Sequence, residues 1–205
     1  MLIQIKDIKA VAYAMAGKNE TRECLQGVLL ETDGKNARLV ATDGHRMHAV
    51  QFYDAGDDND YIVKLGSYIL PPEFVKYVCK NKDAKKSSVI ISINDKKLAA
   101  NLLDNEVATF DLVDGKYPDY TRMVPRDLSG GSAIYNPDYL ADAQNGARYF
   151  TGLNEIVYPV MPNGDGVGVI NLGDFIALVM PLRSDKMRLD APECKWQTKL
   201  HGGTK

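Results

Sequence analysis

Two short patterns in the sequence combine residue types that could support chemistry. His45 and His48 lie three residues apart, but no third His, Cys or carboxylate stands at ligand spacing, and a β-strand would point the two to opposite faces. The run Asn-Gly-Asp-Gly-Val-Gly-Val at 163–169 has the glycine content of a phosphate loop. It precedes a predicted strand and not a helix, so no helix N-terminus would face a phosphate, and a hairpin turn is expected. We therefore predict neither a metal nor a cofactor.

The sequence gives no support for nucleophilic catalysis. It contains no Gly-x-Ser-x-Gly elbow, and no cysteine has a plausible histidine partner. Cys24, Cys79 and Cys194 are separated by 55 and 115 residues, which fits neither a disulfide framework nor a zinc site. Cys24 and Cys79 are predicted to be small core residues. We expect a protein without enzymatic activity of its own.

Composition excludes several broad classes of protein. The 205 residues are 45% apolar, which is enough for a core and excludes a mainly disordered chain. Lys and Arg number 25 against 27 Asp and Glu, so a uniformly basic, DNA-wrapping surface is not expected. No segment approaches the roughly 18 apolar residues of a membrane helix, and the first residues lack the features of a signal peptide. A soluble, cytoplasmic protein with no membrane partner is predicted.

The same order of secondary-structure signals occurs three times along the chain. Each unit reads as a strand, a helix and three further strands, and the units start near residues 1, 60 and 131. In the third unit, Asn136 is expected to cap a helix whose first turn accepts Pro137. The predicted strands are 2–6, 26–32, 37–42 and 47–53; then 61–65, 88–93, 98–103 and 107–113; then 132–135, 154–160, 166–170 and 175–182. The first two helices are predicted over 7–16 and from Pro71-Pro72 onward.

This repeat indicates an α+β fold of βαβββ modules, in which antiparallel sheets carry helices on one face. A single module of about 60 residues would leave strand edges exposed, so the modules should pair edge to edge. The expected organisation is a complete two-module domain at 1–125, a one-module partial domain at 126–184 and a tail at 185–205. The third module is left with a free edge that requires a partner.

Three segments in this order resemble the bacterial DNA polymerase III beta subunit, or sliding clamp, family. They are the 21–31 segment with the 39–47 segment, which contains the turn Thr-Asp-Gly-His-Arg; the run Leu-Val-Asp-Gly-Lys-Tyr-Pro-Asp-Tyr at 112–120; and the final strand Leu-Val-Met-Pro-Leu-Arg at 178–183. The resemblance implies a DNA-clamp fold in which 1–125 match the middle domain and 131–184 match the second half of the last domain. By the same resemblance, the chain is expected to lack the family's first domain and the first half of its third, and to add a tail.

The resemblance also implies a groove that binds short peptides of DNA polymerase and the clamp loader. The apolar residues of the set would form adaptable walls, and its arginines could orient a peptide at the rim. The alternative for Leu25, Val179 and Met180 is that they are only core residues. The positions carried over are Arg22, Leu25, Thr42, Gly44, His45, Arg46, Met47, Pro118, Arg122, Met123, Asn136, Tyr139, Val179, Met180, Pro181, Leu182 and Arg183.

A clamp requires only a basic lining of helices around double-stranded DNA, with non-specific phosphate contacts. The candidates are Lys76, Lys80 and Lys82, followed by Lys85 and Lys86, with Lys9 and Arg148 as weaker ones; the alternative is a solvated helix face. The first hypothesis is a processivity factor that works as a homo-oligomer; four protomers would supply twelve modules. The rival is a non-ring adaptor or regulator that keeps only the groove. The tail could be disordered, or it could fold back beside Arg183 and compete with peptides.

Overall fold

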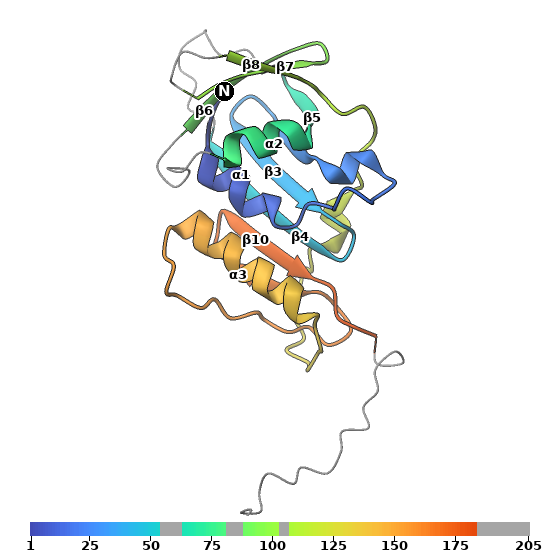
Figure 1. Ribbon diagram of the computed structural model, residues 1–205. Coiled ribbons are helices and arrows are strands. Elements are labelled where there is room, and N and C mark those ends of the chain that lie inside the picture. Colours follow the sequence, from blue (N-terminus) through green and yellow to red (C-terminus); the bar gives the residue numbers. More distant parts are fainter. Residues whose placement is uncertain (54–62, 81–87, 103–106, 184–205) are drawn as a thin grey trace, which may run out of the picture.

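The computed structural model describes residues 1–53, 63–80, 88–102 and 107–183. Two antiparallel sheets and a layer of helices make up this part of the chain (Figure 1). The elements, in chain order, are β1 (Leu2–Gln4), α1 (Ile5–Ala12), η1 (Glu23–Gln26), β2 (Val28–Thr32), β3 (Asn36–Thr42), β4 (Arg46–Tyr53), β5 (Gly66–Leu70), α2 (Pro72–Cys79), β6 (Ser88–Asn94), β7 (Lys97–Asn101), β8 (Val107–Asp111), η2 (Tyr120–Met123), α3 (Pro137–Thr151), β9 (Gly168–Asn171) and β10 (Phe175–Val179).

The first two modules exchange their first strands. One sheet has the order β1-β6-β7-β8, so β1 joins three strands of the second module. The other has the order β5-β2-β3-β4-β10-β9, so β5 joins the first module. β4 then pairs with β10 over five residue pairs, from Phe175 opposite Val50 to Val179 opposite Arg46. The predicted edge-to-edge pairing of modules is confirmed, and this pairing attaches the third module to the first.

The main core lies between the helices and the sheets. Helix α1 lies between α2 and α3 on one side of the six-stranded sheet (Figure 1). The apolar stripes of the helices, for example Ile8 of α1 and Phe74 of α2, are fully buried against residues such as Ile91 and Phe175 from the strands. Burying one such side chain contributes about 1.5–3 kcal/mol. The α+β arrangement predicted from the sequence is confirmed.

A second, smaller core covers the opposite face of the six-stranded sheet. Met47 of β4 and Leu178 of β10 face each other there, and Tyr117 packs over them with Leu25 of η1. Successive strand residues point to opposite faces, so β4 and β10 supply both cores with alternate residues. This second core is the layer on which the candidate site is built.

Helices α1 and α3 approach each other closely where α3 has a glycine. A Cβ on Gly146 would lie 2.8 Å from the carbonyl oxygen of Ala10 and 2.8 Å from Nδ1 of His48, well inside van der Waals contact. Ala143 and Ala147 of the same helix are fully buried. These small residues therefore set how closely the third module docks on the first.

The boundaries of the first two modules differ from the prediction in several places. The strand predicted at 61–65 forms at β5, Gly66–Leu70, where its register places Ile69 opposite Leu29; residues 61 and 62 lie outside the described residues. Helix α1 begins at Ile5 and ends at Ala12, and Ala16 then donates its backbone N–H to the carbonyl of Leu25. The remaining strands differ from the prediction by one or two residues at an end, as is usual for pattern-based boundaries.

The third module contains less strand than predicted. Residues 132–135 contribute only an isolated bridge between Tyr135 and Pro181. Residues 154–160 form no strand, because their backbone groups bond to side chains of α3: Gln144 accepts from the N–H of Tyr158, and Arg148 donates to the carbonyl of Ile156. A single bridge joins Met161 to Val169, and the glycine run forms a turn before β9 as predicted. No helix of the described residues is long and apolar enough to cross a membrane.

Asp7 is a buried acid in the first turn of α1. Its side chain is only 6% exposed, Oδ1 has no hydrogen-bond partner, and burial raises the pKa of the carboxyl from 3.8 to about 6. Because the folded pKa lies above the unfolded value, the folded state binds this proton more tightly, and the associated stability is lost as pH rises from about 4 through 6.

We predict that Asp7→Asn raises the free energy of unfolding at pH 7 by up to roughly 3 kcal/mol, which is the free energy that corresponds to raising the carboxyl pKa from 3.8 to about 6. The gain should disappear below pH 4, where the wild-type carboxyl is protonated in both states. Urea unfolding at pH 3.5, 5 and 7 measures this difference, with exposed Asp138→Asn as the matched control. A gain of equal size at all three pH values would contradict the prediction.

Candidate peptide-binding groove

The Thr-Asp-Gly-His-Arg motif forms a turn that its own side chains close. Thr42 Oγ1 donates to the carbonyl of Arg46 at 2.6 Å and accepts from the N–H of Gly44 at 3.0 Å. Asp43 Oδ1 accepts from the backbone N–H groups of His45 and Arg46. Gly44 has φ of +90°, a conformation that disfavours other residues. The motif is therefore a rigid hairpin turn between β3 and β4.

The end of β10 lies against this turn. Met180 donates its N–H to the carbonyl of His45 at 2.8 Å, and Leu182 donates to the carbonyl of Ile134 at 2.7 Å. The first of these bonds continues the β4–β10 pairing beyond the last ladder residue, and the second joins the same segment to Ile134, just before α3. The segments 42–47 and 179–183, far apart in the sequence, consequently form one surface.

Arg46 connects this turn to α3. Its side chain is 13% exposed and forms ion pairs with Asp43 (Nε to Oδ2, 3.3 Å) and with Asp142 of α3. Its guanidinium lies 4.7 Å from the ring centroid of Tyr139, whose ring is 6.1 Å from that of His45. Two carboxylates and an aromatic face thus compensate the cost of enclosing the cation.

The apolar residues of the predicted groove divide into buried and accessible ones. Leu25 and Met47 are fully buried in the second core, and Val179 is buried on the helix side of the sheet. These three residues lie beneath the surface. Leu25 and Val179 are therefore core residues, which was the alternative considered for them. Met180 and Leu182 are 39% and 45% exposed, and Met123 is half-buried against the second core. These three would form the accessible apolar wall.

The 113–120 motif packs onto the sheet beside the turn. The hydroxyl of Tyr117 accepts from the N–H of Thr42 at 3.1 Å, and burial raises the pKa of Tyr117 well above its usual value. Pro118 is exposed next to it. Asp119 caps η2 by accepting from Thr121 and pairs with Arg122, which is 85% exposed. Tyr117 therefore fixes this segment, while Pro118 and Arg122 remain at the surface.

One further predicted residue flanks the turn with a polar group. Arg22 pairs with Glu20 (Nε to Oε1, 2.8 Å), and its hydrogen bonds lower the pKa of Glu20 to about 2. Arg22 also lies against Gly44. A cavity of about 530 Å³ opens here, lined by residues 16–20 with Asp43 and His45.

The remaining predicted groove residues lie at the start of α3 and after β10. Asn136 accepts from the N–H of Asp138 and so caps α3, as predicted. Pro181 is half-buried, and Arg183 is exposed at the end of the described residues.

Sequence reasoning missed the residues that hold the site together. Asp43, Asp142 and Tyr117 make its ion pairs and its buried hydroxyl contact, yet none was among the predicted groove residues. Asp142 follows Tyr139 by three residues on α3, so its place on the same helix face could have been inferred. Nothing in the sequence signals the 117-to-42 contact, because it spans 75 residues.

The histidines have separate environments. His45 is 71% exposed at the turn. His48 is fully buried, its Nδ1 lies 2.9 Å from the carbonyl oxygen of Ala10, and burial lowers its pKa to about 4. His45 lies in the turn and not in the strand, with its ring 6.1 Å from that of Tyr139, so the expected opposite orientation of two strand residues does not apply. In the described part of the chain no three His, Cys, Asp or Glu residues gather as metal ligands would. Cys24 and Cys79 are half-buried, so the prediction of core cysteines holds only in part.

The residues predicted to contact DNA lie on the helical side of the molecule. Lys76 and Lys80 are exposed on α2. Lys9 Nζ lies 4.6 Å from the ring centroid of Tyr149, and Arg148 donates to a backbone carbonyl, so both are partly engaged within the protein. Lys82, Lys85 and Lys86 lie outside the described residues, as does the tail. The helices thus carry all four of these described basic residues, and Lys76 and Lys80 at α2 are the most accessible of them.

Comparisons with known proteins identify the family. Residues 3–119 match the DNA polymerase III beta subunit, central domain family, which is more than half of the chain. The chain belongs to the DNA polymerase III beta subunit family. It is 37% identical to the beta sliding clamp of Vibrio cholerae over 122 residues and 33% identical to that of Escherichia coli K12 over 120 residues; these cover 60% and 58% of this chain. In both cases the match spans only 31% of the relative.

Solved structures extend the likeness beyond the central domain. A sliding clamp from Pseudomonas aeruginosa aligns with 89% of this chain and 65% of its own, with a TM-score of 0.69 at 20% identity. The sliding clamp from Bacillus subtilis aligns with 90% of this chain and 64% of its own, with a TM-score of 0.70 at 17% identity. These identities show the fold alone. The predicted membership of the beta subunit family and the α+β clamp fold are both confirmed, for a chain that spans about a third of its curated relatives.

The Arg46 to Asp142 ion pair should couple the turn to α3. We predict that Arg46→Gln and Asp142→Asn each destabilise the protein, and that a double-mutant cycle gives a coupling of about 1–3 kcal/mol, as for partly enclosed charge-assisted bonds. Thermal or urea unfolding of the four proteins provides the measurement. The exposed pair of Lys96 and Asp114 is the control, with an expected coupling below about 1 kcal/mol. Additive effects at Arg46 and Asp142 would show that the pair contributes nothing.

Proposed function

We propose that this chain is a processivity factor of the sliding-clamp type. It binds double-stranded DNA without sequence preference as a homo-oligomer, tethers DNA polymerase or a clamp loader through the groove, and carries out no chemistry of its own in the cytoplasm. The observation that carries this proposal is the β4–β10 pairing, which brings the segments 42–47 and 179–183 of a beta subunit family member into one surface.

The accessible part of this surface suits a peptide ligand. Met123, Met180 and Leu182 offer apolar side chains at the surface, and methionine adapts its shape to different ligands at little strain. The exposed side chains of Arg22 and Arg122 stand at the rim, where they could bond to a peptide backbone or an acidic side chain. Each arginine already pairs with one neighbouring carboxylate, which holds it in place.

Assembly would use strand edges that this chain leaves open. Among the described strands, β8 pairs only with β7, and its residues Val107, Ala108 and Phe110 are exposed or half-buried. Its counterpart in the third module, β10, is paired with β4, and Phe175, Ala177 and Val179 are buried. The repeat therefore supports a further strand from another protomer beside β8.

One observation favours the rival, a non-ring adaptor or regulator. The strand β4, which accepts β10 within the chain, is no longer available to a neighbouring copy. A ring of copies could not repeat this β4–β10 pairing between protomers and would have to use the β8 edge instead. An adaptor would need only the groove.

Solution mass and retention on DNA separate the two functions. We expect light scattering of the intact protein to show an oligomer, and we expect this oligomer to remain on nicked circular DNA in moderate salt while sliding off the same DNA after linearisation. Lys76→Glu with Lys80→Glu should reduce loading at least tenfold, because phosphate contacts dominate such binding, whereas Lys97→Glu on β7 should not. A monomer that is indifferent to DNA topology would exclude the clamp and leave the adaptor.

The groove can be tested independently of the ring. Peptides selected from a random dodecamer library displayed on phage, with the intact protein as target, supply the ligand. We predict that Met180→Glu weakens binding of a selected peptide at least tenfold without changing the melting temperature, because a charge would lie in the apolar wall. Leu128→Glu, at a site of similar 38% exposure outside the groove, is the control. Equal binding by wild type and Met180→Glu would remove the groove from the proposal.

A further inference from the structure

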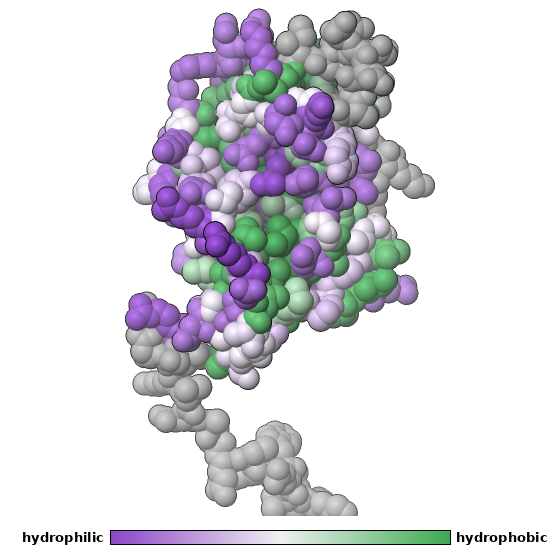
Figure 2. Space-filling view, turned by 180° about the vertical axis from the view of Figure 1, so that it is seen from behind, coloured by the Kyte–Doolittle hydropathy of each residue, from purple (hydrophilic) through white to green (hydrophobic). Residues whose placement is uncertain are grey.

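A cavity of about 330 Å³ lies on the sheet face opposite the helices. Its floor is formed by Met47, Ala49 and Ile176, and one wall by Tyr120 and Val124 from the η2 segment. Figure 2 shows the molecule from the side opposite the view of Figure 1, and apolar side chains gather in the middle and lower part of this face. The cavity therefore belongs to the same side of the sheet as the second core.

Strand register makes this cavity a continuation of the groove. Met47 pairs with Leu178, and two residues further along β4 Ala49 pairs with Ile176. Residues two apart on a strand share a face and stand about 6.6–7 Å apart. An extended peptide that contacts Met180 and runs along the sheet would lie over Ile176 after about four residues and would reach the Gln51 and Arg38 end of the cavity after about six.

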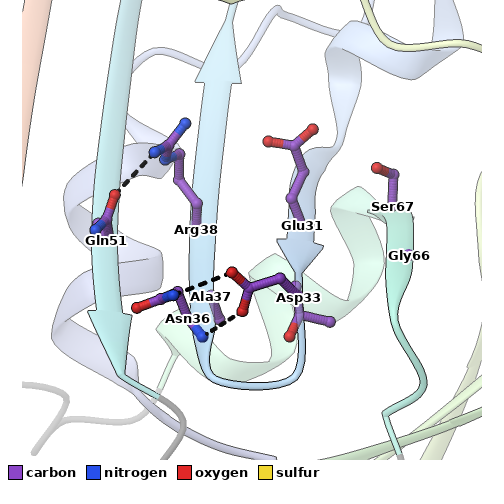
Figure 3. Close-up of a pocket in the computed structure, with 9 residues that line it drawn as sticks. Glu31, Asp33, Asn36, Ala37, Arg38, Gln51, Gly66 and Ser67 are labelled. Atoms are coloured by element: carbon purple, nitrogen blue, oxygen red, sulfur yellow. Dashed lines mark hydrogen bonds between the residues drawn. The ribbon is translucent and has the colours of Figure 1, made fainter.

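The far end of the cavity presents hydrogen-bond donors. Gln51 uses its side-chain oxygen to accept from Arg38 Nη2 at 2.8 Å, and Asn171 uses its own to accept from the N–H of Gly173 at 3.0 Å. Both side-chain NH₂ groups are left to donate outward. Figure 3 shows Arg38 on β3 between Gln51 of β4 and Glu31 of β2. Donors of this kind recognise oxygen atoms.

Arg38 supplies the positive charge at this end. It donates to the hydroxyl of Tyr120 at 2.8 Å and to Gln51, and among the described residues it forms no ion pair with a carboxylate. A guanidinium has five N–H donors, so further ones remain available. The carboxylate of Glu31 accepts from Tyr120 at 2.5 Å. Asp174 lies exposed on the opposite rim, so solvent weakens its repulsion of a bound carboxylate but does not abolish it.

We propose that this cavity is a subsite for a carboxylate of the partner peptide, either an acidic side chain or the C-terminal group, which Arg38 binds while an apolar part of the same residue covers Ala49 and Ile176. The inference rests on the proposed function, because the peptide must first occupy the groove. It makes Arg38 a specificity-determining residue for the peptides that this chain accepts.

Selection from the dodecamer library tests the subsite directly. Wild-type protein should enrich peptides with apolar residues followed, at a fixed spacing of about four to six residues, by Asp, Glu or the C-terminus. Arg38→Gln protein should still enrich the apolar residues but lose the carboxylate. No enrichment on wild type would remove the proposed groove itself, whereas apolar enrichment without a carboxylate, or an unchanged carboxylate preference on Arg38→Gln, would overturn only the subsite.

A cycle between protein and peptide isolates the contact from any change in fold. One selected peptide, its Asp→Asn or Glu→Gln analogue and its C-terminal amide are labelled with fluorescein, and their affinities are measured by anisotropy. Arg38→Gln should lower the affinity for the acidic peptide about tenfold, as expected for the loss of one charge-assisted hydrogen bond. Its affinity for the neutralised peptide should fall less than twofold. Whichever analogue abolishes the difference identifies the side chain or the terminus as the ligand.

Two further variants serve as controls: one should increase the affinity for the acidic peptide, and the other should leave it unchanged. Asp174→Asn removes a repelling charge and should strengthen the acidic peptide, which keeps the test valid if Arg38→Gln unfolds after losing Tyr120. Lys97→Gln removes a positive charge from the other sheet and should change nothing. If Arg38→Gln and Lys97→Gln weaken the acidic peptide equally, or if Asp174→Asn weakens it, the proposed subsite is wrong.

Discussion

The antiparallel pairing of β4 with β10 is the interaction on which the rest of the structure depends. It joins the third module to the first, extends one sheet across both, and directs alternate residues of each strand into two separate cores. The helices reinforce it, because the small residues of α3 allow that helix to approach α1 closely. Without this pairing, Arg46 would have no Asp142, Met180 would not bond to His45, and neither the groove nor the cavity beside it would exist.

The site shows how a polar surface can be rigid without a large core. Two side chains of the 42–46 turn, Thr42 and Asp43, bond to its own backbone, and Tyr117 reaches across from a distant segment to hold Thr42. Arg46 is enclosed but meets two carboxylates and a ring, so its desolvation is compensated. Such a frame keeps the exposed methionines in position while they remain able to adapt to a ligand.

Periodicity predicted most of the fold, and it failed where backbone partners lie outside the segment. The first two helices, the cap at Asn136 and the strands 26–32, 37–42 and 47–53 depend on local signals, and they form with their starts within one or two residues of those expected. Residues 154–160 are rich in β-formers and were predicted as a strand, but the side chains of Gln144 and Arg148 bond to their backbone groups. The groove residues were proposed from a resemblance and not from geometry, so their burial, and the roles of Asp142 and Tyr117, could not be foreseen from spacing.

The exchange of first strands between the two opening modules determines the order in which the chain can fold. Met1 bonds to Ile91, ninety residues away, and β1 finds its ladder only in β6. During synthesis the first module therefore remains incomplete until the second has left the ribosome, with its apolar first strand unpaired. Contacts of such long range slow folding and expose strand edges to other chains. The edge of β1 is therefore open to pairing with other chains until the second module is complete.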